Sequence, residues 1–419
     1  MLKVGIIGVG TVGTSVAQIL KDNADVISAR TGVAIEVKMG IVRDLEKVRD
    51  LDIPLSDNVD DVLDDEEIDV VVELMGGVEE AFEVVKKALL KGKAVVTANK
   101  ALLAYHRYEL QELAKDIAFE YEASVAGGIP IINALRDGLS ANHIESIMGI
   151  MNGTCNYMLT KMTNEGVAYN DILKEAQRLG YAESDPTFDV GGYDAAHKLL
   201  ILASIAYGID AKPEDILIEG IQNITQEDIA FAKEFGYAIK LLGIAKKDGN
   251  DVELRVHAAL IRKEKMIAKI DGVMNGISVV GDKVGETLYY GPGAGGDATA
   301  SAVIANIIDI ARAGKKAPML GFDKPLEGLL RLKATDDINS KYYLRINVSD
   351  RAGVLAKITK VFEIHNISVE TMLQRPSSES SANLLISTHI ALEKDIQDMI
   401  KELRTLDFIK SAPVMIRIV

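Results

Sequence analysis

The chain begins with a glycine-rich turn between an apolar run and a helical pattern. Residues 2–8, LKVGIIG, are strand-like, and the stretch TSVAQILKDN after the turn has apolar residues at helical spacing. A helix N-terminus presents unpaired N–H groups and partial positive charge, and glycines let a pyrophosphate approach the backbone closely. A tight turn without a ligand would have the same pattern, but its position favours dinucleotide binding through Gly8, Gly10, Thr11, Val12 and Gly13.

Strand-like and helical segments alternate over the first third of the chain. Helical stretches such as EEAFEVVKKALLKG separate strand-like runs at 33–42, 68–74, 94–97 and 118–123. This alternation is typical of a parallel, doubly wound sheet. We therefore predict an α/β protein with a Rossmann-like, NAD(P)-binding domain at residues 1–132 and a return helix at about 295–318.

The rest of the chain predicts two further domains. Mixed helical and strand-like pieces indicate an α+β domain for substrate binding, catalysis and dimerisation at residues 133–294. Residues 319–340 mix turn residues with charges and indicate a linker. Beyond it the segments follow the order β-α-β-β-α-β, which predicts a ferredoxin-like domain at residues 341–419.

Composition excludes several classes of protein. The net charge of −15 comes from acidic residues along the whole chain, which argues against a nucleic-acid partner. No apolar stretch is long enough to span a bilayer, so we expect an unprocessed cytoplasmic protein without a membrane partner. The single cysteine, Cys155, excludes an intramolecular disulfide and a cysteine-based zinc cluster.

The choice of cofactor depends on the end of the second predicted strand, because an acid there holds ribose hydroxyls and an arginine holds a 2′-phosphate. This strand ends in Arg43-Asp44, with Lys47 and Arg49 about one turn further on. Arg43 with Lys47 favours NADP, whereas Asp44 favours NAD. We expect NADP, with NAD as the alternative.

The sequence Thr97-Ala98-Asn99-Lys100 follows a predicted parallel strand. Open α/β sheets bind ligands at the carboxyl ends of their strands, so Thr97, Asn99 and Lys100 should face the cofactor. A lysine there can meet a substrate carboxylate or a developing alkoxide. The alternative is a solvated lysine at the start of the next helix.

A second charged cluster stands at the start of an apolar helix. Asp194 and Lys198 are four residues apart on one helical face, and residues 199–207, LLILASIAY, can only form a buried helix. A surface ion pair is the alternative, but Asp189 and a Gly-Gly pair precede the cluster and favour a cleft. A desolvated lysine beside carboxylates is a tunable proton carrier, which makes Lys198 a candidate catalytic residue.

Residues 176–198, with the pattern A-x3-GYAESDP-x2-DV-x-G-x-D-x3-K, closely resemble the signature of homoserine dehydrogenases. The resemblance extends to the first glycine turn, to TANK, to EASVAGGIP and to NGTCNY, and it covers about residues 1–320. It implies reversible hydride transfer between a nicotinamide cofactor and the pair L-homoserine and L-aspartate 4-semialdehyde.

The resemblance also implies residue roles. Lys198 would donate a proton to the aldehyde oxygen, with Lys100 beside the cofactor and the reacting oxygen. Glu183 and Asp194 would bind the amino and hydroxyl groups of homoserine, and both join the two lysines as catalytic residues. Further substrate contacts would come from Tyr181, Asp189, Asn152, Gly153 and Thr154, and further cofactor contacts from Gly180, Glu183, Gly293 and Gly295.

Two further sites follow from resemblance. Glu122 and the carbonyls near Val125, Gly127 and Ile129 resemble a monovalent-cation site, and such oxygens suit Na⁺; a plain buried turn is the alternative. The C-terminal domain resembles an ACT domain, which would bind an amino-acid effector such as threonine. Its alternative role is dimerisation, and we expect a homo-oligomer. The effector residues would be Asp350, Gly353, Val354 and Leu355.

Two other functions compete with this interpretation. A phosphorylating semialdehyde dehydrogenase would need a thiolate nucleophile, for which Cys155 is the only candidate. A non-catalytic sensor of dinucleotide and amino acid would leave the acidic cluster around Lys198 without a purpose.

Overall fold

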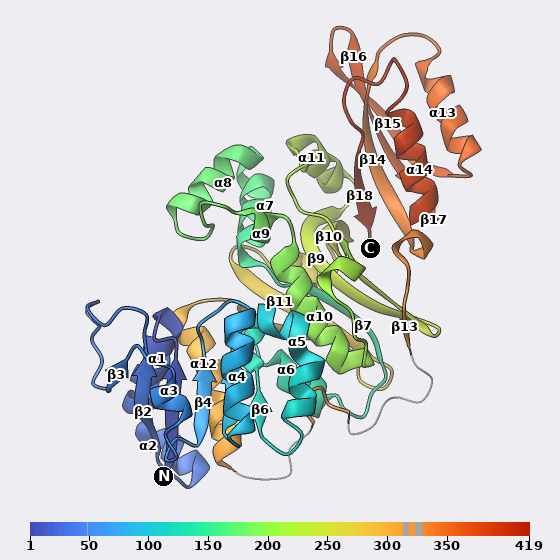
Figure 1. Cartoon of the computed structure of the whole chain (residues 1–419). Helices are drawn as coiled ribbons and strands as arrows, with labels where there is room; N and C mark the ends of the chain where they lie inside the picture. The colour runs from blue at the N-terminus through green and yellow to red at the C-terminus, as the bar shows by residue number, and fades with distance from the viewer. Residues whose placement is uncertain (48, 313–317, 323–329) are drawn as a thin grey trace. The chain divides into compact units, whose positions relative to one another are not determined.

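The computed structural model describes residues 1–419 except 48, 313–317 and 323–329 (Figure 1). The chain divides into two compact units. The first comprises Met1–Gly153, Asp194–Asp215 and Val273–Leu330, and the second comprises Thr154–Tyr193, Ile216–Gly272 and Arg331–Val419. The end of the predicted return helix and part of the predicted linker fall outside the described residues, and the predicted domain boundaries stay a prediction.

A six-stranded parallel sheet forms the centre of the first unit. Its strand order is β3-β2-β1-β4-β5-β6, so the order reverses between β1 and β4. In open α/β sheets, such a switch point is where ligands bind. The strands are β1 (Leu2–Ile7), β2 (Ile35–Ile41), β3 (Leu55–Ser56), β4 (Val70–Glu73), β5 (Ala94–Thr97) and β6 (Phe119–Glu120).

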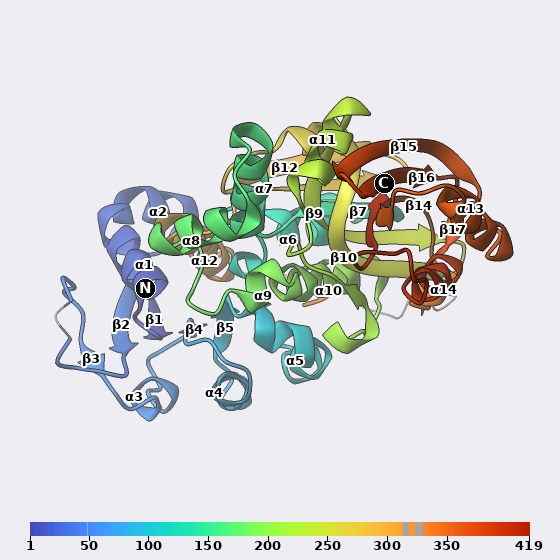
Figure 2. The ribbon, with the colours of Figure 1, turned by 90° about the horizontal axis from the view of Figure 1, so that it is seen from above.

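Helices cover both faces of this sheet, as Figure 2 shows. One face carries α1 (Thr11–Asp22), α2 (Ala24–Thr31) and α12 (Gly296–Ala311); the other carries α3 (Asp60–Leu63), α4 (Glu79–Leu90) and α5 (Lys100–Leu113). Because helices cover both sides, the central strands are apolar without alternation, and Val70, Val71 and Val72 are fully buried. The predicted Rossmann-like α/β class is confirmed.

The rest of the first unit contains three antiparallel strands and several helical segments. Strand β11 (Met274–Gly281) pairs with β7 (Ile144–Ile150) on one side and with β12 (Gly285–Pro292) on the other. The turn after β6 forms η1 (Glu122–Ser124), α6 (Ile131–Asn133) and η2 (Ala134–Gly138). The apolar helix α10 (Tyr193–Tyr207) belongs to this unit from Asp194 onward, and its residues from Asp194 to Ile205 are all buried. This confirms the predicted buried helix.

The second unit contains a long hairpin of β9 (Tyr237–Asp248) and β10 (Asp251–Arg262). Three short strands pair with β10 in parallel, at successive positions along it. They are β13 (Arg331–Leu332), β8 (Leu217–Ile218) and β18 (Val414–Ile418). Its helices are α7 (Gly153–Glu165), which starts in the first unit, α8 (Tyr169–Arg178), α9 (Thr187–Val190) and α11 (Gln226–Glu234). Short 3₁₀ turns are η4 (Met266–Lys269) and η5 (Thr335–Asp337), while η3 (Pro213–Asp215) lies in the first unit.

The C-terminal part has the predicted β-α-β-β-α-β order. It consists of β14 (Asn339–Ser349), α13 (Val354–Ile364), β15 (Val369–Ser378), β16 (Ser381–Thr388), the short β17 (Ala391–Leu392), α14 (Glu393–Leu403) and β18. Figure 1 shows α13 and α14 on one face of the sheet. Their apolar sides bury Ile358, Ile396 and Met399 against Leu344 and Ile386.

Buried charges tie this C-terminal part to the residue after β8 and to α11. The fully buried guanidinium of Arg417 donates to Glu219, at 2.6 Å, and to Glu393, at 2.5 Å. On α11, the buried Asp228 accepts from the Tyr343 hydroxyl at 2.9 Å and from Arg345 Nε at 2.8 Å. Because unpaired buried charges are costly, these bridges fix the C-terminal part within its unit. Among the described residues, no helix is long and apolar enough to cross a membrane.

Candidate active site

Each of the three glycines in the first turn is required or tolerated for a different physical reason. Gly8 has φ +103°, and a Cβ there would lie 2.6 Å from the backbone of Leu74. A Cβ at Gly13 would lie 2.5 Å from the carbonyl oxygen of Gly8, so this glycine lets α1 pack closely on the turn. Gly10 has open space around its Cα. The turn therefore leaves room for a group that approaches the backbone at the start of α1, as a pyrophosphate does.

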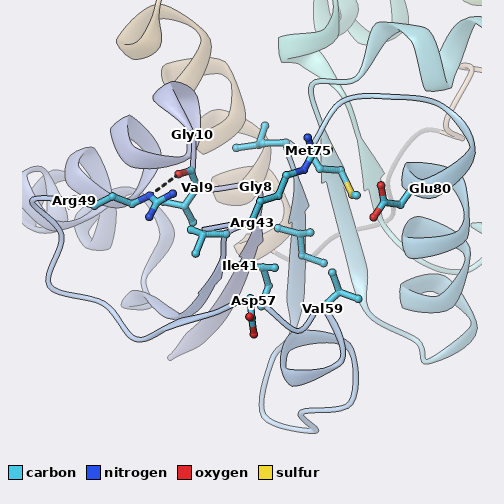
Figure 3. Close-up of a pocket in the computed structure, with 13 residues that line it drawn as sticks. Gly8, Val9, Gly10, Ile41, Arg43, Arg49, Asp57, Val59, Met75 and Glu80 are labelled. Atoms are coloured by element: carbon cyan, nitrogen blue, oxygen red, sulfur yellow. Dashed lines mark hydrogen bonds between the residues drawn. The ribbon is translucent and has the colours of Figure 1, made fainter. Parts of the chain in front are cut away.

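A cavity of about 320 Å³ opens beside this turn, at the carboxyl ends of β1, β2 and β4. Gly8 and Gly10 line it at the glycine turn, and Met75 lines it after β4 (Figure 3). Leu74 is a further lining residue. Arg43 and Arg49 line it at the end of β2. Two acids, Asp57 and Glu80, line the cavity as well. Its place at the switch point suits a dinucleotide, and the two arginines suit the phosphates of such a ligand.

Arg49 is a cavity residue that the sequence did not assign. Its Nε donates to the carbonyl of Val9 at 3.3 Å (Figure 3), and its Nη1 donates to the carbonyls of Asp44 and Lys47 at 2.8 and 2.9 Å. These bonds hold its guanidinium over the glycine turn. Arg43 and Lys47 are both exposed, but only Arg43 lines the cavity.

The second glycine-rich turn lies next to the first. Gly295 has φ +120° and caps α12. A Cβ on Gly296 would lie 2.8 Å from Ser15 Oγ, and a Cβ on Gly127 would lie 2.7 Å from the carbonyl of Gly293. The N-termini of α1 and α12 are thus neighbours.

The TANK sequence positions Lys100 at the start of α5. Asn99 Oδ1 accepts from the backbone N–H of Leu102 at 3.1 Å, which caps the helix, and Asn99 Nδ2 donates to the carbonyl of Gly77 at 2.7 Å. Lys100 then reaches α10, where its Nζ lies 3.2 Å from Asp194 Oδ1. The cap therefore holds the lysine against the buried helix.

Asp194 and Lys198 form the charged centre of the site. Lys198 Nζ donates to Asp194 Oδ2 at 2.8 Å and to the carbonyl of Met151 at 2.7 Å. Asn152 Nδ2 donates to the same Asp194 oxygen at 3.0 Å. Asp194 is 4% exposed and Lys198 is 9% exposed, so neither is the surface pair of the alternative interpretation.

Electrostatics keep the Asp194 carboxylate ionised. Burial acts to raise its pKa, but the ammonium groups of Lys198 and Lys100 and the hydrogen bonds outweigh burial and hold the pKa well below its ordinary value. Lys198 carries three N–H donors, and hydrogen bonds to Asp194 and Met151 use two of them. Two ammonium groups on one carboxylate can thus present donors to a carbonyl oxygen.

His197 is a further residue of the site that the sequence did not single out. Burial, and then the nearby charge of Lys100, lowers its pKa to about 4, so the imidazole is neutral near pH 7. Its ring stands edge-on to Tyr105 at 5.7 Å. A neutral neighbour of this kind adds no competing cation beside Lys198.

Comparisons with known proteins show the family of the chain. The family model "Homoserine dehydrogenase, NAD binding domain" matches residues 8–122, and "Homoserine dehydrogenase" matches residues 130–308. A curated homoserine dehydrogenase of Helicobacter pylori is 54% identical over 418 residues, which cover 100% of this chain and 99% of that protein. The chain belongs to the homoserine dehydrogenase family. An ACT domain model matches residues 342–408, so the family and the ACT domain predicted from sequence are both confirmed.

Solved structures give the same result. The homoserine dehydrogenase of Thiobacillus denitrificans is 45% identical with a TM-score of 0.94, over 100% of this chain and 98% of that chain. A hyperthermophilic archaeal homoserine dehydrogenase in complex with NADPH is 27% identical with a TM-score of 0.63, over 74% of this chain and 97% of that chain. Membership of this dehydrogenase family sets aside the sensor and the Cys155-dependent enzyme. Cys155 is buried, with its Sγ 3.3 Å from the carbonyl of Asp189.

The remaining predicted substrate residues lie in the second unit, apart from Asn152 and Gly153. Thr154 Oγ1 donates to the carbonyl of Tyr181 at 2.6 Å. This bond joins the start of α7 to residues 179–186 between α8 and α9, which we call the signature loop. Tyr181 packs edge-on against Tyr157 at 5.0 Å. Glu183 is exposed, as is Gly180, which has φ +79°, and Asp189 is half-buried on α9. The loop thus presents Tyr181 and Glu183 to solvent.

Glu122 is almost fully buried in the turn of the proposed cation site. Its two carboxylate oxygens accept backbone N–H bonds from Ile132 and Asn133, both at 2.8 Å, and burial raises its pKa to about 7. Ala126 and Gly127 both have φ +54°, so the turn is left-handed at two successive residues. Within the described ranges, no cluster of three or more His, Cys, Asp or Glu side chains could hold a metal. A cation here would therefore depend on backbone carbonyls beside one carboxylate.

The ACT domain has its own cavity. It measures about 240 Å³ and lies where β14 passes into α13, lined by the predicted effector residues Asp350, Gly353, Val354 and Leu355. Gly353 has φ +86° at the N-cap of α13. Gln374 Nε2 closes the cavity by donating to Asp350 Oδ1 at 3.2 Å. A helix N-terminus beside amide and carboxylate groups suits a zwitterion.

Proposed function

We propose that Lys198 is the proton donor in the reversible conversion of L-aspartate 4-semialdehyde to L-homoserine. The observation that carries this proposal is the buried Asp194 carboxylate shared by Lys198 and Lys100, at 2.8 and 3.2 Å. The bound nicotinamide supplies or accepts the hydride. The protein's task is therefore to bind the substrate, to stabilise charge on its oxygen and to move one proton.

Both lysines stabilise the developing charge on the substrate oxygen, and Lys198 then supplies the proton. As the aldehyde carbon gains a hydride, its oxygen gains negative charge, which two ammonium groups stabilise. Lys198 then transfers a proton from its third N–H to the oxygen and becomes neutral, and the alcohol forms. Asp194 restrains the lysine and favours its charged form before the transfer. In the oxidation direction, the neutral Lys198 takes the proton back.

The amino group of homoserine requires carboxylates. We propose that Glu183 and Asp194 bind this ammonium and the hydroxyl. Further substrate contacts are proposed for Tyr181, Asp189, Asn152, Gly153 and Thr154. Glu183 is exposed on the signature loop, so its carboxylate is available to a cation. Raised KM for homoserine in Glu183→Gln, with unchanged cofactor affinity, would support this role; an unchanged KM would contradict it.

Replacing Lys198 with Met should lower kcat by about 10²–10⁴-fold, because proton transfer contributes about that much. Cofactor affinity should stay within about twofold, since Lys198 contacts Asp194 and Met151 and does not line the cavity. Steady-state kinetics at 340 nm and cofactor titration check both. Lys161→Met is a matched control, because Lys161 forms a surface i,i+4 pair with Glu165. Near-wild-type turnover in Lys198→Met would refute the assignment.

We also propose that NADP is the preferred cofactor. Arg43 and Arg49 both line the cavity at the end of β2, and two guanidinium groups suit a 2′-phosphate. Asp44, the residue that would favour NAD, is exposed, and it does not line the cavity.

Arg43→Ala and Arg49→Ala should each lower the preference for NADP over NAD by about tenfold, the size of one lost charge-assisted hydrogen bond. The ratio of kcat/KM for the two cofactors measures this preference. Arg30→Ala, an exposed arginine on α2, serves as the control. A wild-type preference for NAD, or an unchanged ratio in both variants, would contradict the proposal.

A monovalent cation such as Na⁺ is proposed at Glu122, with the carbonyls near Val125, Gly127 and Ile129. The support is a buried carboxylate beside a left-handed turn, an arrangement that a cation would compensate. Replacing Na⁺ and K⁺ with choline should lower activity and melting temperature, and Glu122→Gln should remove this dependence. Activity and stability that do not respond to the cations would leave a plain buried turn.

Threonine is the proposed effector of the ACT domain. The cavity beside Asp350, Gly353, Val354 and Leu355 supports this proposal. Threonine should bind and inhibit, and Gly353→Val should abolish both effects, because φ +86° disfavours a β-branched residue and the helix N-terminus would be displaced. Calorimetric titration and inhibition assays check this. Neither binding nor inhibition in the wild type would leave dimerisation as the role of the domain.

A homo-oligomer and a cytoplasmic location also stay proposals. The exposed edge of β15 in the ACT sheet supports association, because such edges readily pair. Light scattering tests the mass in solution, and a monomer would contradict the proposal. Cell fractionation tests the location.

A further inference from the structure

Glu73 is a buried carboxylate that the mechanism above does not use. It is the last residue of β4 and is 0% exposed. In the sheet it is aligned with Ile7 at the end of β1 and with Thr97 at the end of β5. The next two residues, Leu74 and Met75, line the cavity beside the glycine turn. Glu73 therefore lies at the carboxyl ends of the central strands, where open sheets place their ligands.

The hydrogen bonds around Glu73 favour its ionised form. Its Oε2 lies 2.6 Å from Thr97 Oγ1, and its Oε1 accepts the backbone N–H of Met75 at 2.9 Å. Thr97 Oγ1 accepts the backbone N–H of Asn99 at 2.9 Å, which leaves the hydroxyl proton of Thr97 available to Glu73. Hydrogen bonds donated to both carboxylate oxygens stabilise the charged form.

No cation balances this charge. Among the residues that the structure describes, Glu73 forms no salt bridge, although Asp194 has two. Burial raises the pKa of Glu73, and hydrogen bonds from Thr97 and the backbone oppose that rise. A buried carboxylate without a counter-charge is costly, and such groups concentrate at functional sites.

We propose that Glu73 makes the site discriminate between the two redox states of the nicotinamide and favours the oxidised one. The inference rests on the proposed cofactor site. An oxidised nicotinamide ring carries a positive charge, whereas the reduced ring is neutral, so a fixed negative charge beneath the strand ends attracts only the former. The carboxylate thereby shifts the balance among enzyme-bound species toward oxidised cofactor and alcohol.

A purely structural role would have a different signature. Through Thr97 and Asn99, Glu73 connects the loop after β4 to the loop after β5 and to the cap of α5. Loosening these loops would weaken the oxidised and the reduced cofactor equally. Loss of charge would weaken the oxidised cofactor alone, by roughly tenfold, which corresponds to a charge interaction of about 1.4 kcal/mol.

The test is the ratio of the dissociation constants of NADP⁺ and NADPH, each measured by calorimetry. In Glu73→Gln this ratio should rise roughly tenfold, while Glu73→Asp, which keeps the charge, should stay close to the wild type. Glu79→Gln is the matched control, because it removes an exposed acid at the start of α4 that does not line the cavity. An unchanged ratio in a folded Glu73→Gln would overturn the proposal.

Glu73→Ala is a second neutral variant in case Glu73→Gln does not fold, and its ratio should also rise roughly tenfold. An unchanged ratio in a folded Glu73→Ala would likewise overturn the role of Glu73. Failure of the wild type to bind either form would instead refute the cofactor site itself, so the two failures are distinguishable.

Discussion

The Asp194 carboxylate is the interaction on which the site depends. It lies in the first turn of a helix whose following residues are all buried to Ile205, so water cannot solvate it well. Two lysines from different elements, Lys198 on the same helix and Lys100 on α5, supply the compensating charge. The need to neutralise one buried carboxylate therefore fixes two ammonium groups next to each other, an arrangement that like charges would otherwise resist.

Buried charges are also compensated by partners of opposite charge elsewhere in the chain, where they stabilise the fold. Arg417 bridges Glu219 and Glu393, and Asp228 accepts hydrogen bonds from Tyr343 and Arg345, so the ACT domain is fixed to α11 and to the residue after β8. Strand β14 contains Arg345, and its last residues line the same cavity as Asp350. An amino acid bound there would therefore act on a strand that is already tied to the rest of its unit. Glu73, in contrast, forms no salt bridge with any residue that the structure describes, and this difference motivates its separate role.

Most of the correct predictions came from short-range patterns in the sequence. The glycine spacing, the alternation of strands and helices and the four-residue spacing of Asp194 and Lys198 are short-range features, and each is found in the fold. The residues missed depend on distant contacts. Arg49 reaches Val9 across forty positions, and the carbonyl of Met151 meets Lys198 across forty-seven. Glu73 falls inside the predicted strand 68–74, and the sequence gives no sign of its partner. Only the pairing of β4 with β5 brings Thr97 to it.

The most direct test of this account is the charge of Asp194. Asp194→Asn keeps the shape and the hydrogen bond from Asn152 within reach but removes the charge that both lysines share. The account predicts that kcat falls by about 10²–10³-fold while the dissociation constant for NADPH stays nearly constant. Turnover within about threefold of the wild type, measured at 340 nm with saturating homoserine, would show that the shared carboxylate is not what makes these lysines active.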